Sequence, residues 1–238
     1  FCASLADWLD DVVPIEWLMD LSALIHATPN LGWMLLTKRP ENWAKRIHLA
    51  AQLDHALLGV KLLNWRAGQA PPNVWLGVSV EDQETADKRI PLLLQIPAAV
   101  RFVSYEPALG PIRLDHVPIR TGKGDDFRPV GGVDWVIAGG ESGPKARPSH
   151  PDWFRSVRDQ CVAAGIPYLF KQWGEWVPPD QASPGVFDSR PHLPSFQFPT
   201  HEPMSDRGPI VYRVGKRAAG RMLDGREWNE VPRVKGCQ

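Results

Sequence analysis

Short apolar runs alternate with longer amphipathic stretches along most of the chain. The amphipathic stretches place apolar residues at helical spacing, and turn residues separate them from the apolar runs. This alternation is typical of a parallel α/β sheet, in which each strand is followed by a helix. The apolar runs predict strands at residues 1–5, 33–36, 74–80, 100–104, 133–138 and 168–170. The stretches between them predict helices at residues 15–26, 41–51 and 84–94 and from residue 151 onward.

The clearest unit is a strand, a loop, a helix and a second strand in the later part of the chain. Its first apolar run, 133–138, stops at Gly139. Pro151 suits the first position of a helix, and Gly165 suits the left-handed position that ends one. The next apolar run, 168–170, follows directly. Two consecutive strands joined by one helix are expected to be parallel, with a right-handed crossover.

Two stretches break this pattern before residue 133. Residues 57–72 contain Trp65, Gly68 and paired prolines, which predict an irregular excursion or insertion. Residues 109–132 are rich in glycine, proline and charge, which predicts a long loop.

The character of the sequence changes again after Trp176. Residues 177–208 are dense in proline, which predicts irregular structure. Residues 210–214 favour a strand, and residues 215–228 favour a short helix or a turn. We therefore expect an α/β domain at 1–176 and a C-terminal extension at 177–238 that packs on it.

A barrel and an open doubly wound sheet both fit this order of elements. Polar residues follow each predicted strand, and in a parallel barrel all of these strand ends meet at one mouth. In an open sheet only the ends near the switch point would meet. We therefore predict a TIM-barrel-like parallel barrel with an irregular C-terminal extension. The polar residues in question are Ser4, Asp7, Thr37, Lys38, Ser79, Glu81, Ser104, Glu106, Gly139 to Ser142, Lys171 and Gln172.

Three carboxylates, those of Glu81, Glu106 and Glu141, each come shortly after a predicted strand. At a shared mouth they could do acid/base work, bind a metal or hold the amine of a ligand. Alternatively, each could cap a helix or form an ordinary salt bridge at the rim. If the barrel closes, they share the mouth with Lys38, Lys171 and Gln172.

The segment 139–143, GGESG, is the second candidate for chemistry. Paired glycines permit a close approach of the backbone, and their exposed amides can hold a phosphate or carboxylate, although glycines also serve tight turns. The segment lacks the spacing of a P-loop or of a dinucleotide-binding turn. The seven histidines and the three cysteines have no metal-ligand spacing, so no metal ligands are assigned.

The composition of the chain indicates which binding partners and which cellular compartment to expect. Lysine plus arginine and aspartate plus glutamate both number 27 in 238 residues, so no overall field attracts nucleic acid or anionic lipid. No apolar run has membrane-spanning length, and the widely separated cysteines favour a reducing, cytoplasmic setting. Because the chain begins with Phe1 inside a predicted strand, we expect an N-terminal segment to be missing.

Several segments, in order, resemble one family: TKRP, GVSVED, RFVSYEPALGPI, DWVIAGGESGPKARP, YLFKQWGEW and YRVGKRAAGRMLDGREW. Together they are similar to a phage-associated family of uncharacterised proteins, the three-Cys-motif proteins, over nearly the whole chain. The resemblance implies a radical S-adenosylmethionine enzyme of barrel type with a four-iron four-sulfur cluster. The cluster-binding cysteines would lie upstream of Phe1, so we expect no cluster and no activity in this fragment. Gly139, Gly140 and Glu141 follow a late strand and are not equated with the GGE motif of those enzymes.

The site assignment combines both lines of reasoning. We expect catalytic roles for Glu81, Glu106, Glu141 and Lys171. Cofactor contacts are expected from Ser79, Ser104, Gly139, Gly140 and Ser142, and substrate contacts from Lys38, Arg39 and Gln172. The substrate could be a nucleic acid or nucleotide, and a protein encoded nearby could be a partner. The two alternatives are a metal- or phosphate-handling barrel enzyme that uses the strand-end carboxylates and a non-catalytic module that binds a partner.

Overall fold

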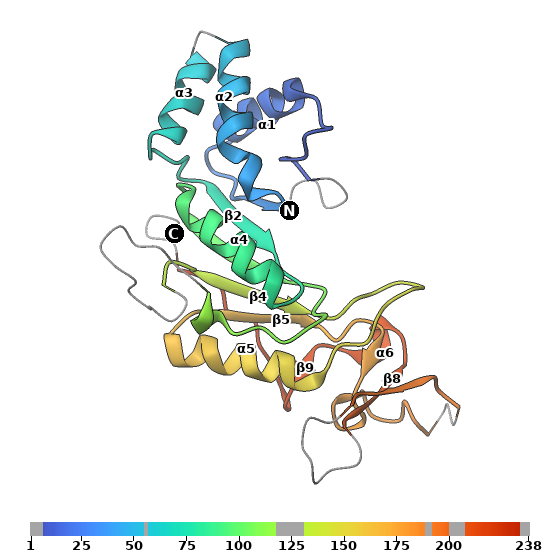
Figure 1. Ribbon diagram of the computed structural model, residues 1–238. Helices are drawn as coiled ribbons and strands as arrows, with labels where there is room; N and C mark the ends of the chain where they lie inside the picture. The colour runs from blue at the N-terminus through green and yellow to red at the C-terminus, as the bar shows by residue number, and fades with distance from the viewer. Residues whose placement is uncertain (1–6, 55–56, 118–130, 189–191, 200–207, 234–238) are drawn as a thin grey trace.

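The structure is a computed structural model, which describes residues 7–54, 57–117, 131–188, 192–199 and 208–233. The predicted strand at 1–5 and most of the predicted loop at 109–132 lie outside these ranges. The main strands are β1 (Trp33–Thr37), β2 (Val74–Ser79), β3 (Val100–Tyr105), β4 (Trp135–Gly139) and β5 (Tyr168–Gln172). The main helices are α1 (Ile15–Ala27), α2 (Trp43–Leu53), α3 (Leu57–Arg66), α4 (Gln83–Gln95) and α5 (Pro151–Ala164), as Figure 1 shows.

The five main strands form one parallel sheet in the order β1-β2-β3-β4-β5. Each strand therefore lies beside the next one in the sequence, and the order never reverses as it does in a doubly wound sheet. The predicted parallel α/β architecture is confirmed, and this order is compatible with part of a barrel. The described strands do not close into one. The outer edge of β5 is covered by the C-terminal segment, since Phe170 N donates to Trp228 O and Glu230 N to Tyr168 O.

Alternate residues of each strand point to opposite faces of the sheet. One face shares the main core with the helices, and Figure 1 shows α4 lying along β2 and α5 along β5. Val78, Val103 and Phe170 are strand residues of this core. The opposite face carries a smaller apolar cluster, and this face would line the interior of a closed barrel. This cluster consists of buried Phe102, Trp135 and Ile137 with partly buried Met34, Leu36, Trp75 and Leu169.

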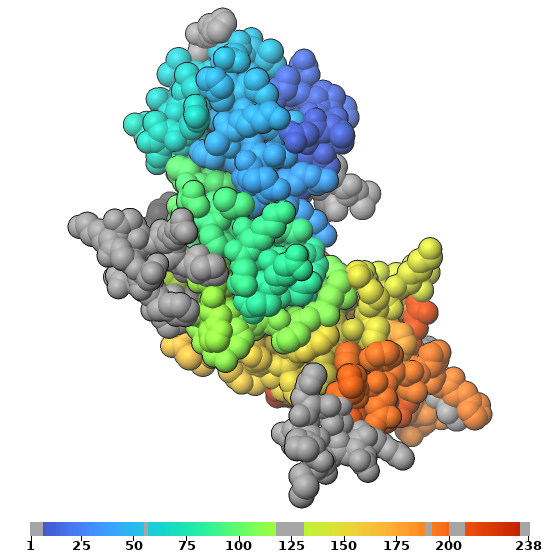
Figure 2. All heavy atoms as spheres, viewed as in Figure 1, coloured from blue at the N-terminus to red at the C-terminus, as the bar shows by residue number. Residues whose placement is uncertain are grey.

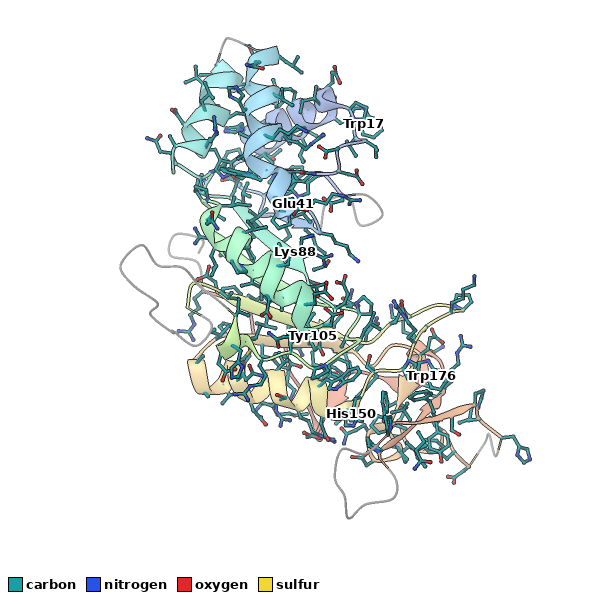
Figure 3. All side chains as sticks on the ribbon, in the orientation of Figure 1. Trp17, Glu41, Lys88, Tyr105, His150 and Trp176 are labelled. Atoms are coloured by element: carbon teal, nitrogen blue, oxygen red, sulfur yellow. The ribbon has the colours of Figure 1, made fainter. Side chains whose placement is uncertain are left out.

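Figure 2 shows the residues of α1, α2 and α3, coloured blue to cyan, at one end of the molecule and the orange residues of the C-terminal part at the other. Trp17 in α1 and Trp176 in the C-terminal part mark these two ends in Figure 3. Among the described residues, none of the helices is both long and apolar enough to cross a bilayer.

The prediction of irregular structure at 57–72 was wrong, because residues 57–66 form α3. Tertiary packing overrides the weak local signal there. Trp65 is buried, stacks on Trp8 with 6.4 Å between ring centroids and donates its indole N–H to Pro97 O at 2.7 Å. The buried indole thus ties the helical layer to the segment before β3.

The boundaries of α4 and α5 follow from local chemistry. Asp82 accepts a hydrogen bond from the Thr85 amide at 2.9 Å, and the Thr85 hydroxyl in return accepts from the Asp82 amide, which forms a capping box. Pro151 opens α5, and the His150 ring accepts from the Asp152 amide at 3.1 Å. Gly165 ends α5 with φ of 67°, the left-handed conformation that was predicted for it.

The C-terminal part contains a small antiparallel sheet and a hairpin. β8 (Ile210–Arg213) lies between β6 (Trp176–Val177) and β7 (Ser195–Gln197), so the predicted strand at 210–214 is confirmed. The segment predicted as a short helix or turn forms α6 (Lys216–Ala219) and the hairpin of β9 (Met222–Leu223) and β10 (Arg226–Glu227).

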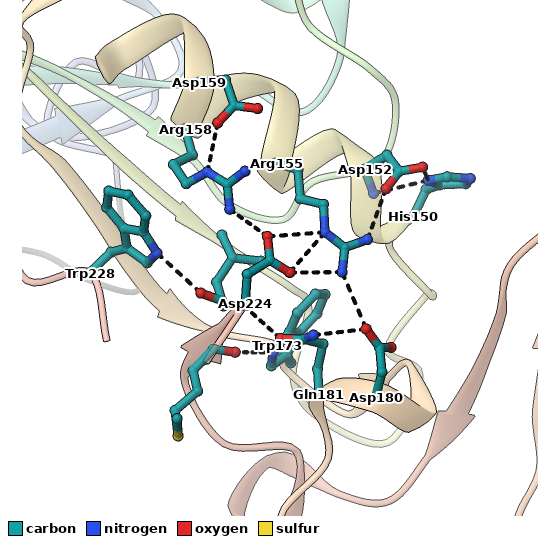
Figure 4. Close-up of polar contacts among 12 residues, drawn as sticks. His150, Asp152, Arg155, Arg158, Asp159, Trp173, Asp180, Gln181, Asp224 and Trp228 are labelled. Carbon is teal, nitrogen blue, oxygen red and sulfur yellow. Dashed lines mark hydrogen bonds and ion pairs between the residues drawn. The ribbon is translucent and has the colours of Figure 1, made fainter. Parts of the chain in front are cut away.

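Asp224 at the tip of the β9–β10 hairpin docks this hairpin on α5 (Figure 4). Its carboxylate accepts hydrogen bonds from Arg155 at 2.9 and 3.0 Å and from Arg158 at 2.5 Å. The Asp224 amide donates to the side-chain oxygen of Gln181 at 2.7 Å. The hydrogen bonds from Arg155 and, to a smaller extent, from Arg158 hold the pKa of the Asp224 carboxyl below its ordinary value.

Replacing Asp224 with asparagine is expected to lower the free energy of unfolding at neutral pH by about 1 kcal/mol or less. A carboxyl with a lower pKa in the folded state stabilises the fold fully above its unfolded pKa. That contribution is lost as the pH falls through the folded pKa. Urea denaturation of both proteins should therefore differ at neutral pH and agree in strong acid. An equal difference at both pH values would mean that the charge of Asp224 contributes nothing.

Candidate functional site at the carboxyl ends of the strands

The strand register brings most of the predicted site residues to one edge of the sheet. Ser79 pairs with Ser104 across β2 and β3, and Gly139 pairs with Gln172 across β4 and β5. Both serines are almost fully buried. Because all five strands are parallel, the carboxylates that follow β2, β3 and β4 come from the same edge.

Glu81 lies between two cations. Lys38 Nζ forms an ion pair with Glu81 Oε1 at 2.7 Å. On the other side, Arg89 Nη1 donates to Glu81 Oε2 and to the carbonyl oxygen of Ser79, each at 2.8 Å. Arg89 thus fixes the Glu81 side chain against the end of β2.

Glu106 has a separate set of partners. Lys171 Nζ donates to Glu106 Oε2 at 2.9 Å, and the side-chain amide Nε2 of Gln172 donates to Oε1 at 3.4 Å. The carboxylate lies over Gly139, where an added Cβ would be 3.3 Å from its carbon and from Oε1. The structure therefore brings together Glu106, Lys171, Gln172 and Gly139.

Glu141 is held by Arg147 across the loop that follows β4. The Arg147 guanidinium donates to both carboxylate oxygens, at 2.8 and 2.9 Å, and the Arg147 amide donates to Oε2 at 2.7 Å. These hydrogen bonds lower the pKa of the Glu141 carboxyl, and the nearby ammonium of Lys38 lowers that pKa further. The pKa of Arg147 is raised, chiefly by its hydrogen bonds to Glu141 and to a smaller extent by the charge of Glu81. The ends of β1, β2 and β4 therefore share one electrostatic cluster.

Three cations of this site, those of Lys38, Lys171 and Arg147, are more exposed than the carboxylates, whereas Arg89 is only 16% exposed. The side chains of Glu81 and Glu106 are only 12% and 19% exposed. By contrast, Lys38 and Lys171 are 52% and 50% exposed, and Arg147 is 59% exposed. An incoming ligand would therefore meet positive charge first, with negative charge behind it.

Gly140 and Gly143 of the GGESG segment have different surroundings. Gly140 packs on the backbone that follows β5, where an added Cβ would lie 1.9 Å from Trp173 O. The Gly140 amide donates to Gln172 O at 3.0 Å, and the Gly143 amide donates to Glu175 Oε1 at 3.1 Å. These two amides are thus occupied within the protein. Ser142, in contrast, is exposed.

Arg39 points to a different neighbourhood from the other predicted contacts. It forms ion pairs with Asp7 at 3.4 Å and Asp10 at 2.9 Å. Asp7 also accepts hydrogen bonds from the Thr37 hydroxyl and the Lys38 amide, each at 2.7 Å. Arg39 therefore helps to hold the segment before α1 against the end of β1.

Sequence reasoning missed the two arginines that anchor the carboxylates. Arg89 lies on the second turn of α4 and points back to Glu81, and Arg147 closes its loop on Glu141. The only available signal was their position shortly after a strand-end carboxylate, which is too common to single them out.

Metal ligands are not gathered at this edge. Within the ranges that the structure describes, no group of three or more His, Cys, Asp and Glu side chains is arranged to hold a metal ion. Cys161 lies on the buried side of α5, and this burial raises the pKa of its thiol to about 12. Cys2 and Cys237 lie outside the described residues.

These features define an α/β protein with a charged site at the carboxyl ends of its parallel strands. The chain belongs to a family described as protein of unknown function (DUF5131), whose model matches residues 1–232. Searches of curated proteins and of solved structures find no match.

Proposed function

We propose that this chain is the ligand-binding α/β part of an enzyme that uses S-adenosylmethionine. The observation that carries the proposal is the group formed by Glu106, Lys171 and Gln172 above Gly139. Parallel α/β proteins bind their ligands at this edge of the sheet. The resemblance to three-Cys-motif proteins favours S-adenosylmethionine among the small ligands that such a group could hold.

The chemistry of the group suits the amino-acid part of that ligand. A carboxylate such as Glu106 accepts charge-assisted hydrogen bonds from an α-ammonium group. Lys171, half exposed beside it, can pair with the α-carboxylate. When bound, S-adenosylmethionine supplies a reactive sulfonium, and the residues of this chain would bind and orient it. The Glu106–Lys171 ion pair would then be exchanged for two pairs with the ligand.

The iron–sulfur cluster that the resemblance also implies does not fit the described residues. Such a cluster needs cysteine thiolates. The described ranges contain one cysteine, Cys161, whose buried thiol packs in the main core. We therefore assign no cluster ligand within these ranges.

Replacing Glu106 with glutamine is expected to weaken S-adenosylmethionine binding about 10-fold to 100-fold, because one charge-assisted hydrogen bond is lost. Isothermal titration of the wild type and of this variant with S-adenosylmethionine measures the change. Glu227→Gln, the same change on the exposed β10 strand, should leave the affinity unaltered. Absence of binding to the wild type at millimolar ligand, or equal affinity of Glu106→Gln, would refute the proposal.

A second candidate, a phosphate-handling enzyme, is favoured by the outward position of the cations. Lys38 and Arg147 belong to one electrostatic cluster and are more exposed than the carboxylates that they pair with. Titration with inorganic pyrophosphate in the same instrument distinguishes the two candidates. Binding of pyrophosphate that is lost in Lys38→Met, without binding of S-adenosylmethionine, would favour this second function.

A further inference from the structure

The large apolar side chains that remain exposed are concentrated in the helical layer formed by α1, α2 and α3. Nine of the thirteen most exposed ones among the described residues fall between residues 12 and 63. Large apolar patches on a protein surface mark sites of interaction more often than scattered single residues do. The nine are Val12, Trp17, Leu24, Leu31, Leu49, Leu53, Leu57, Val60 and Leu63.

The outer side of α3 is the most apolar part of this layer. Leu57 is 69% exposed and Val60 is 50% exposed, and Leu63 continues the same stripe one turn later. The inner side of α3 is also apolar, since Leu62 and Trp65 are buried in the core. Apolar side chains thus lie on both the inner and the outer side of α3, and an exposed apolar stripe of this kind marks a contact surface.

The outer side of α1 offers a surface of complementary character. Trp17 is 63% exposed and lies at the margin of the helical layer (Figure 3), and exposed Leu24 lies two turns further along α1. Glu16 and Asp20 are exposed on the same helix. The surface therefore combines apolar side chains with negative charge.

Charge is distributed unevenly between these two surfaces. Residues 1–37 contain five acidic residues and no lysine or arginine, whereas residues 38–80 contain six lysines and arginines and two acidic residues. Asp7, Asp10 and Asp11 are paired within the chain. Within the described ranges, Glu16 and Asp20 on α1 have no ion-pair partner, and neither do Lys61 and Arg66 on α3. A partner for each surface must therefore bring the opposite charge together with apolar contacts.

We propose that a second copy of this chain covers the outer side of α3 with the outer side of its own α1. Leu57, Val60 and Leu63 would pack against Trp17 and Leu24 of the other copy. Lys61 and Arg66 would then face its Glu16 and Asp20. The two contacting surfaces, the outer side of α1 and the outer side of α3, differ from each other. If a two-fold axis lets two copies use both surfaces on one another, the result is a closed dimer. If each copy uses its two surfaces on different neighbours, the result is a ring or a chain. This inference does not depend on the proposed function.

Sedimentation velocity over a range of protein concentrations tests self-association directly. The wild type should change from monomer to a larger species as the concentration rises. Val60→Asp should weaken association more than about tenfold, because it buries an unpaired charge. Val162→Asp, the same change at an exposed position of α5, should associate like the wild type. A wild type that stays monomeric at all concentrations would overturn the proposal.

Charge reversal tests the pairing of α1 with α3. Lys61→Glu alone and Asp20→Lys alone should each weaken self-association, and an equimolar mixture of the two variants should recover it. Melting curves followed by circular dichroism confirm that each variant is folded. No recovery in the mixture would refute the pairing. Binding of a monomeric wild type to vesicles of phosphatidylcholine and phosphatidylserine, lost in Val60→Asp, would assign the surface to membranes instead and would equally refute the proposal.

Discussion

Gly140→Ala is expected to cost the protein about 3 kcal/mol of folding free energy or more. The new Cβ would lie 1.9 Å from the carbonyl oxygen of Trp173 and 2.7 Å from its carbon. Neither backbone can move away freely, because the Gly140 amide donates to Gln172 O and the Glu175 amide donates to Glu141 O at 2.9 Å. The variant must break these hydrogen bonds or separate the ends of β4 and β5.

Gly32→Ala is the matched control for this change. An added Cβ at Gly32 meets no atom within 4 Å, and its φ does not lie in the left-handed region. The control should therefore change the unfolding free energy by less than about 0.5 kcal/mol. Urea denaturation of the three proteins measures both effects. If Gly140→Ala lowered the unfolding free energy by less than about 1 kcal/mol, the ends of β4 and β5 would be able to move apart at little energetic cost.

The surroundings of Gly140 also bear on the proposed function. Gly139, on one side of it, lies against the Glu106 carboxylate, and Glu141, on the other side, is itself one of the carboxylates of the charged site. A rigid contact at Gly140 therefore holds two parts of the site in fixed positions relative to β5. This arrangement fits a site in which the fold, and not the ligand, sets the positions of Glu106 and Glu141.

Most of the fold could be predicted from the sequence, because short-range signals define its elements. Pro151 and Gly165 mark the ends of α5, and both could be identified from the sequence. Each of these residues acts through bonds or sterics within a few positions of itself. A sequence therefore displays such boundaries without knowledge of the tertiary structure.

The prediction failed where a segment depends on distant partners. α3 has apolar residues on both its inner and its outer side, so its periodicity indicates no face, and its helix is held by contacts of Trp65 with Trp8 and Pro97. Closure of a barrel also depends on strands far apart in the sequence. The choice between a barrel and an open sheet therefore could not be made from strand-end residues alone.

The candidate site also has one part that could be predicted from the sequence and another part that could not. The strand-end carboxylates could be found from the sequence, because each strand stops at a recognisable turn. Their partners Arg89 and Arg147 could not be found, because the direction in which a long side chain points depends on the tertiary structure. Even the pairing of Glu106 with Lys171 required the register of β4 and β5, which includes a bulge near Gly139. Register is set by non-local contacts and carries little local signal.

Trp173→Ala is expected to lower the unfolding free energy by about 3 to 5 kcal/mol, the usual range for removal of a large buried aromatic side chain. Trp173 is 1% exposed and lies directly after β5. Its ring centroid is 5.3 Å from that of Phe154 on α5 and 5.1 Å from that of Phe170 on β5. Its indole N–H donates to Met222 O at 2.7 Å, so the change also leaves that carbonyl unpaired (Figure 4).

Two further variants separate packing from the hydrogen bond. Trp173→Phe keeps an aromatic ring and loses the donor, so its loss should be smaller than that of Trp173→Ala. Trp17→Ala removes an exposed indole and should cost less than about 0.5 kcal/mol when measured at a concentration too low for self-association. If Trp173→Ala unfolds in two steps, with the β9–β10 hairpin released first, Trp173 mainly anchors the C-terminal extension. A single transition at lower urea would instead mean that the extension and the parallel sheet fold as one unit, because the same side chain joins β5, α5 and the hairpin.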